Sequence, residues 1–275
     1  MVSAPTGGPL PSLRVGRPST EARPARRLVL SAAEWTVLAD GRLPDAPPGF
    51  GPAEIERVDA GAAVAALVER GVITPDAEPV PAVAAQLVVL RRPAVTVRLD
   101  VDGRGGARRT WIAVGSGVVV SVLTAVDGGV ELSVAPAVRL GEELARAVPD
   151  AASVTGAGEE SAGSRPPAGR VPWVVLADEP DAHRAADADD LALVQDLERR
   201  TAGSLTCLVL GRTGEQVGAG QVSWLATDAG WVGLRPRPDG SPQRMVDLVP
   251  VEPADLGTWL APTLAALLEG SDEQS

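Results

Sequence analysis

A short pattern occurs twice in this sequence, about 110 to 116 residues apart, and this repetition constrains the fold more than any other feature. The two copies are Trp111-x-Ala113-x-x-x-Gly117 and Trp224-x-Ala226-x-x-x-Gly230. The chain contains only six Trp residues, so a matched pair is informative. Self-similarity over such an interval predicts that one supersecondary unit is used twice.

A second echo follows the first at a similar interval. Its two copies are Leu140-Gly141-x-x-Leu144 and Leu256-Gly257-x-x-Leu260. Together with the periodicity described below, the echoes predict an α+β fold. We expect two pseudo-symmetric halves, each with a helix, an antiparallel sheet and a second helix, joined in one mixed domain.

The first half changes from helical to strand-like patterning near Pro93. Ser31-x-x-Glu34 has the spacing of a capping box, in which each side chain satisfies the other residue's free amide. Three helices are therefore expected: a short one after Ser31, one over 54–70 that Gly71 closes, and one over 81–92. Apolar residues then recur in short runs separated by tight turns, which predicts an antiparallel meander. The expected strands are 95–101, 111–114, 118–123 and 130–134, and a helix over 140–148 follows.

The second half repeats this order. Asp189 and Asp190 are expected to cap a helix that Gly203 ends, and a final helix opens around Pro253. The expected strands are 205–210, 221–227, 231–235 and 245–249. The predicted domain organisation is a disordered leader over 1–27, one domain over 28–270 with half-repeats 28–150 and 171–270, a flexible loop over 151–170 and an acidic tail over 271–275.

Composition excludes several classes of function. The net charge of −11 disfavours general nucleic-acid binding, because phosphate contacts need a basic surface. No apolar stretch approaches the length of about 18 residues that spans a bilayer, so we expect no membrane insertion. A single cysteine excludes an internal disulfide framework. The chain is therefore expected to be cytoplasmic.

Candidate catalytic residues are few. His183 is the only histidine and lies in a polar stretch, where a surface position is expected. Cys207 alternates with apolar neighbours, which is typical of a buried structural thiol. The chain has no Lys, so it has no P-loop lysine, and its glycine-rich run over 211–220 precedes a strand rather than a helix N-terminus. We expect no catalytic residue and no cofactor.

Carboxylates are more abundant than other reactive groups. The acidic segment 178–190 has ligands suited to a hard cation but lacks the EF-hand order, so solvated charge and helix capping are expected rather than a metal site. Glu142 and Glu143 are adjacent on a predicted helix and are expected on a solvated surface. A carboxylate-based, divalent-cation-dependent enzyme or small-ligand domain remains the alternative function.

The Trp residues indicate packing and a possible interface. Core positions are the first interpretation for Trp111, Trp224 and Trp259. Trp231 begins a predicted strand beside a turn, where an aromatic side chain also serves as an interface anchor. Trp231 is therefore the candidate partner-binding residue.

The order of several short motifs over residues 28–268 resembles that of one known family. The motifs are Leu30-Ser31-Ala-Ala-Glu34 before Leu43-Pro44, Ala66-Leu67-Val-Glu-Arg70-Gly71-Val72, Ala84-Ala85-Gln-Leu87-Val-Val-Leu90-Arg-Arg-Pro93-Ala-Val-Thr-Val97, Trp231-Val232, and Val249-Pro250-Val-Glu-Pro253-Ala-Asp-Leu256. Together they resemble the EspG family of ESX (type VII) secretion-associated chaperones of actinobacteria. The Arg-rich leader and the segment 151–170 match no motif of that family.

The resemblance implies a pseudo-twofold α/β fold and a function in binding rather than catalysis. Members bind PE–PPE heterodimers in the cytosol, shield an aggregation-prone tip and pass the cargo to the secretion machine. A cytosolic adaptor for a PE–PPE-like or other ESX-type helical protein is the leading expectation. The resemblance transfers no contact residue to this sequence. A structural module of the same fold without cargo is a further alternative.

Overall fold

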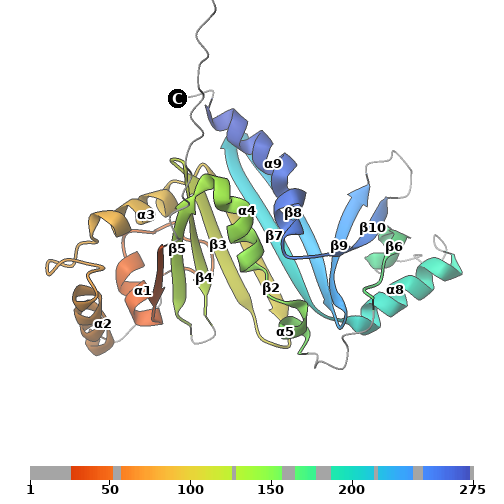
Figure 1. Ribbon diagram of the computed structural model, residues 1–275, viewed down its shortest axis with the longest axis horizontal. Helices are drawn as coiled ribbons and strands as arrows, with labels where there is room; N and C mark the ends of the chain where they lie inside the picture. The colour runs from red at the N-terminus through yellow and green to blue at the C-terminus, as the bar shows by residue number, and fades with distance from the viewer. Residues whose placement is uncertain are drawn as a thin grey trace, which may run out of the picture.

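A computed structural model of the chain shows one ten-stranded sheet, in which every paired strand is antiparallel to its neighbour, with helices on both faces (Figure 1). The strand order is β1-β5-β4-β3-β2-β7-β8-β9-β10-β6. The structure describes residues 26–51, 57–125, 128–156, 165–177, 187–213, 216–237 and 244–272. The predicted leader therefore lies outside the described residues up to position 25, as do His183 and most of the acidic segment before Asp187.

The elements of the first half follow the predicted order. They are β1 (Arg26–Leu30), α1 (Ala32–Ala39), α2 (Arg57–Glu69), α3 (Pro81–Arg91), β2 (Val95–Gly103), β3 (Arg108–Gly115), β4 (Val118–Thr124), β5 (Val130–Pro136), the 3₁₀ turn η1 (Ala137–Arg139), α4 (Leu140–Ala147) and α5 (Ala151–Thr155). The capping box is confirmed, since Ser31 Oγ accepts from Glu34 N–H and Glu34 accepts from Ser31 N–H. Gly71 has the expected left-handed φ of 65°.

The second half has the same order, with two corrections at the helix that directly precedes its meander. Its elements are β6 (Gly169–Pro172), α6 (Trp173–Leu176), α8 (Ala188–Arg200), β7 (Thr201–Thr213), β8 (Gln216–Thr227), β9 (Gly230–Arg237), β10 (Met245–Val251) and α9 (Asp255–Asp272). Asp187, not Asp189 or Asp190, caps α8 by accepting from the Asp190 N–H. The helix ends at Arg200, and Gly203 lies inside β7, where a side chain would collide with Val154 of α5.

The two halves join at the centre of the sheet through β2 and β7, which pair antiparallel over nine residues from Val95↔Gly211 to Gly103↔Gly203. On each side the next strands in the chain add outward, and β1 and β6 occupy the two edges. This arrangement is the predicted pseudo-twofold. The prediction of a flexible loop over 151–170 is wrong at both ends, because residues 151–155 form α5 and residues 169–170 belong to the edge strand β6.

The Trp echo matches equivalent strands but not equivalent side chains. Trp111 of β3 pairs with Arg98 of β2, which pairs with Leu208 of β7. Trp224 of β8 pairs with Leu205 of β7, which pairs with Val101 of β2. Arg98 and Val101 are three residues apart on the same strand. Residues at odd offsets along a strand point to opposite faces, so the two Trp rings lie on opposite sides of the sheet. The identical spacing is therefore a coincidence of sequence within a genuine structural duplication.

The two copies of the Leu-Gly echo, on α4 and α9, contact each other in the structure. Leu144 of α4 and Leu260 of α9 are buried in the same core. A Cβ added at Gly257 would lie 3.4 Å from the Cα of Gly141. Equivalent residues that contact each other must lie close to the pseudo-twofold axis, so α4 and α9 cross on that axis.

The helices divide the sheet into two unlike faces. On the closed face, α4, α5 and α9 cover the central strands and form the largest core with Trp224 and Trp231. On the open face, α1–α3 cover the outer strands of the first half and α6 and α8 cover those of the second. Figure 1 shows these two helix groups at opposite ends of the molecule, with α4 and α9 between them.

The glycine-rich run over 211–220 packs against α9. A Cβ at Gly218 or Gly211 would lie within 3.1 Å of Leu267, and one at Gly220 would lie 2.6 Å from Thr263. The helix therefore approaches β7 and β8 more closely than any side chain allows. Residues 211–213 belong to β7 and residues 216–220 to β8, so both strands are longer than expected and extend into this run.

Candidate protein-docking surface

The central strands leave a surface of mixed polarity uncovered on the open face. Because cross-strand partners point to the same face, the registers place one set of side chains together there: Thr96, Arg98 and Asp100 of β2, Thr206, Leu208 and Leu210 of β7, and Gln221 and Ser223 of β8. We call these eight residues the central open face. They lie between the two helix groups that cover the outer strands.

The side chains on the two faces of these strands differ in how far they are buried. Val97, Leu99, Cys207 and Val209 point to the closed face and have no exposed surface. Their neighbours on the central open face are half-buried or exposed, and Leu210 keeps 38% of its surface accessible. A sheet whose centre is covered on one side alone offers a firm platform to another molecule, since the backbones of β2 and β7 are fixed by strand pairing on both sides.

The charges of this surface are arranged as a short chain. Arg98 lies 2.8 Å from Asp100 between Nε and Oδ2, and Arg109 Nε lies 3.7 Å from the other oxygen of Asp100. These side chains are a quarter to a half exposed, so the pairs contribute about 0–1 kcal/mol each. Their main effect is to fix the direction of two guanidinium groups on β2 and β3.

A separate apolar groove lies on the same face toward the first edge of the sheet. It has a volume of about 530 Å³ and runs between α3 and the strands β4 and β5. Val88 of α3 lines one wall and has 62% of its surface exposed, and Val118 and Val134 line the side of the strands. The open face thus carries both a mixed central platform and a flanking apolar groove.

Comparison with known proteins identifies the family of this arrangement. The family model described as "EspG family" matches residues 31–261, which is most of the chain. The chain belongs to the EspG family.

One solved structure shows how far this family fold is shared. The chain is similar to a protein described as the Mycobacterium tuberculosis type VII secretion system chaperone EspG5, in complex with a PE25–PPE41 dimer. The similarity has a TM-score of 0.55 at 12% identity and covers 84% of this chain and 94% of the other. At this identity the match supports the fold alone. No curated protein sequence matches the chain.

In this EspG-family chain, the residue predicted to contact a partner lies in the core. Trp231 is 3% exposed, its indole Nε1 donates to the Pro149 carbonyl at 2.9 Å, and its ring packs against Trp224. The expectation of an exposed anchor at this position is therefore wrong, because the Pro149 carbonyl just after α4 and the ring of Trp224 enclose the Trp231 side chain. The most exposed Trp is Trp173 at the start of α6, which is 40% exposed and which the sequence patterns did not single out.

Burial shifts the pKa of two described titratable groups that the sequence had singled out. Burial raises the pKa of the Cys207 thiol to about 12, which keeps it protonated and unreactive. Burial, with the charge of Asp187, raises the pKa of Asp190 at the start of α8. Within the described ranges no cluster of His, Cys, Asp and Glu has the arrangement of a metal site, and no described helix is long and apolar enough to cross a membrane.

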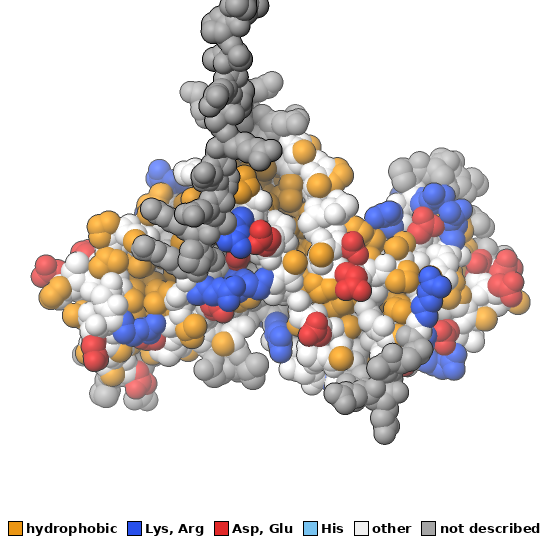
Figure 2. Space-filling model, viewed as in Figure 1, with side chains coloured by type: hydrophobic (Ala, Val, Ile, Leu, Met, Phe, Trp, Pro, Cys, Tyr) orange, Lys and Arg blue, Asp and Glu red, His pale blue; other side chains and the backbone are white. Residues whose placement is uncertain are grey.

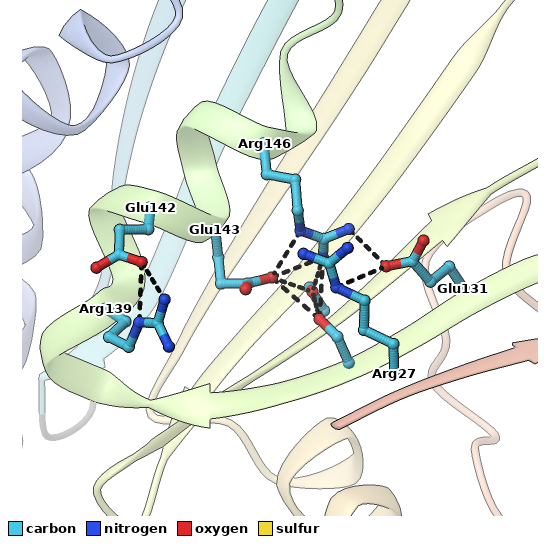
Figure 3. A network of polar contacts seen from close by, with 8 residues as sticks. Arg27, Glu131, Arg139, Glu142, Glu143 and Arg146 are labelled. Carbon is cyan, nitrogen blue, oxygen red and sulfur yellow. Dashed lines mark hydrogen bonds and ion pairs between the residues drawn. The ribbon is translucent and has the colours of Figure 1, made fainter. Parts of the chain in front are cut away.

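Glu143 is the exception to the expected solvated carboxylates of α4. It is buried beneath the helix, where its Oε2 accepts from Ser121 Oγ at 2.9 Å, from Ser133 Oγ at 3.0 Å and from Arg146 Nη2 at 2.6 Å (Figure 3). Burial alone acts to raise the pKa of Glu143, but these donors outweigh it, and the net pKa is lowered. Only Glu142, which pairs with Arg139, lies on the solvated surface as expected.

Proposed function

We propose that this chain is a cytosolic secretion chaperone that binds a helical substrate of the PE–PPE type and escorts it to a type VII secretion system. Membership of the EspG family supports this function, and so does a fold shared with a chaperone whose structure contains a PE–PPE dimer. We further propose that residues 28–270 act as one domain of two half-repeats, because β2 and β7 join the halves in a continuous sheet.

We infer that the substrate docks on the central open face, and its uncovered position carries this inference. Leu208 and Leu210 supply apolar contact, while Arg98 and the neighbouring Thr and Ser hydroxyls supply hydrogen bonds around it. This combination of an apolar centre and a polar rim is the anatomy of a protein interface. A chaperone needs such a shape-complementary surface and needs no convergent acids and bases, so we infer binding rather than catalysis.

The test is co-expression of the full chain with a PE–PPE pair from the same host, followed by size-exclusion chromatography with light scattering. We expect a stable ternary complex. Leu210→Arg should weaken it by at least about tenfold, because a charge is buried against the partner. Val138→Arg is the matched control, since Val138 is 86% exposed and lies on the 3₁₀ turn outside the surface.

Two results would count against these proposals in different ways. If no PE–PPE pair or other ESX-type helical protein of the host binds the chain, the chaperone function is wrong. If a complex forms but Leu210→Arg binds as tightly as Val138→Arg, the function stands and the central open face is the wrong surface.

A further inference from the structure

The sheet splits between β8 and β9. These strands pair only from Ser223↔Leu234 to Thr227↔Gly230. Beyond that point, residues 216–222 of β8 pair with β7 alone, and residues 235–237 of β9 pair with β10 alone. Figure 1 shows the two strands diverging from their shared end. A seven-residue stretch in the interior of the sheet order therefore has a backbone edge without a described strand partner.

This inner edge lacks the devices that protect the outer ones. The outer edge strands β1 and β6 are five and four residues long, and β6 carries Arg170 and Pro172. Short length, charge and proline are the usual means by which edges avoid pairing with other chains. The β8 stretch reads Gln-Val-Gly-Ala-Gly-Gln-Val, with neither charge nor proline, and Val217 is 69% exposed. Its sequence therefore favours addition of another strand.

A cleft of about 350 Å³ occupies the point where the strands part. Its walls are Gln221 and Val222 of β8 and Leu234, Arg235 and Pro236 of β9, and its floor is Thr258, Trp259 and Pro262 of α9. Trp259 is held in place from two sides. Its ring packs edge-on to Trp224, and it lies so close to Gly233 that a Cβ there would be 2.4 Å from the ring. The floor is thus a rigid aromatic surface.

The charge beside the cleft is positive. The Arg235 guanidinium stacks 4.4 Å from the centre of the Trp259 ring and forms no ion pair with a described carboxylate. Next along the strand, Arg237 and the edge residue Arg170 share one carboxylate, Asp247. Figure 2 shows Arg side chains gathered at this end of the viewed face. In a chain of net charge −11, this local excess of Arg selects an acidic ligand.

We propose that the β8–β9 cleft binds an extended, acidic segment of a partner protein by strand addition to β8. The backbone of the segment would hydrogen-bond to the free edge at 216–222, as in other cases of β-augmentation. Side chains on its α9 face would place an apolar group on Trp259 and a carboxylate at Arg235. Gln221 also belongs to the central open face, but the floor of this site lies on the opposite side of the sheet, where α9 packs. The proposal does not depend on the identity of the chaperone's substrate.

The probe is the fluorescein-labelled peptide Val-Thr-Glu-Thr-Val-Thr-Glu-Thr, which as a strand presents Val and Glu on one face and Thr on the other. Binding to the full chain is measured by fluorescence anisotropy, and hydrogen exchange is followed over 217–222. We expect saturable binding with slowed exchange in that stretch. A peptide with Lys for Glu and a peptide N-methylated at alternate residues should each bind at least about tenfold more weakly.

Arg235→Glu should weaken the acidic peptide by about tenfold and favour the Lys peptide. Arg108→Glu is the matched control, because Arg108 is an exposed strand arginine in the other half of the sheet. Equal binding of the N-methylated peptide would overturn strand addition, and equal binding of the Lys peptide would overturn the acidic ligand. No peptide binding, together with a chain that dimerises with slowed exchange over 217–222, would assign the edge to a second copy instead. None of these results bears on whether a PE–PPE pair binds the open face.

Discussion

Removing the carboxylate of Glu143 tests whether the buried network under α4 holds the helix to the sheet. Glu143 accepts from two serine hydroxyls and from Arg146, whose guanidinium also reaches Glu131 at 2.7 Å and both hydroxyls at about 3 Å. Ser121 and Ser133 lie 2.6 Å apart but own one hydroxyl proton each. The two serines and Glu143 make three contacts with one another, but only two protons are present to fill them. The Glu143 carboxylate is therefore needed as the final acceptor.

The expected cost follows from what each substitution leaves behind. Glu143→Ala leaves a largely buried guanidinium with one remaining carboxylate, and it leaves one of the two serine hydroxyls without an acceptor, which together should cost about 3–5 kcal/mol of unfolding free energy. Glu143→Gln keeps the shape and one acceptor oxygen and should cost about 1–3 kcal/mol. Replacing both charged partners, Glu143→Leu with Arg146→Leu, removes the unpaired charge and should restore part of the loss.

The assay is urea unfolding followed by circular dichroism at pH 7 and at lower pH. The pKa of Glu143 is lowered in the folded chain, so its stabilisation is complete above the ordinary glutamate pKa and is lost as the pH falls through the folded value. The wild-type chain should therefore lose stability on acidification below about pH 4.5, and the gap between it and Glu143→Gln should narrow. Glu34, whose pKa is also lowered, contributes with the same sign in both proteins.

Three outcomes would refute this reasoning. A loss below about 1 kcal/mol for Glu143→Ala would mean that water reaches the site and replaces the carboxylate. A double leucine variant that is less stable than Glu143→Ala would mean that the network stabilises through its polar contacts themselves. A gap between wild type and Glu143→Gln that stays constant down to pH 3 would contradict the lowered pKa.

Two other predictions follow from packing. Gly220→Val should lower the unfolding free energy by about 1–3 kcal/mol despite the better strand propensity of Val, because the Val side chain collides with Thr263 of α9. The control is Ala219→Val, on the exposed face of the same strand. It should change the unfolding free energy by less than about 0.5 kcal/mol in the same denaturation experiment. Cys207 should react with a thiol reagent at pH 8 about three orders of magnitude more slowly in the folded chain than in urea, since burial raises its pKa to about 12 from 9.0; comparable rates would show that β7 opens readily.

Features set by neighbouring residues were predictable from the sequence. The capping box of Ser31 and Glu34 is formed within one helical turn, and Gly71 and Pro93 end their helices through backbone geometry. The meanders followed from alternation and short turns. These signals need no knowledge of distant contacts, which explains why element order and the pairing of consecutive strands agree with the structure.

Features set by distant contacts were not predictable. β1 is a strand because β5, about 100 residues later, offers its edge, and β6 depends on β10 in the same way. Glu143 is buried by serines on two strands, while its local spacing to Arg146 is that of any solvated ion pair. The consecutive buried residues of β3 hid which face Trp111 takes, and the turn beside Trp231 gave no sign of the carbonyl that covers its indole.

The open centre of the sheet is a geometric consequence of the duplication. In each half the helices before the meander, α1–α3 in the first and α6 and α8 in the second, cover outer strands on one face, while the helix after it, α4 or α9, crosses to the axis on the other. Both copies therefore leave the inner strands bare on the same side. The copies differ where they meet: Arg98 and Asp100 of β2 pair with Leu208 and Thr206 of β7. By symmetry alone, such a surface would accept a partner in two orientations. Because it is polar on one side of the axis and more apolar on the other, a partner that docks there would be held in one orientation.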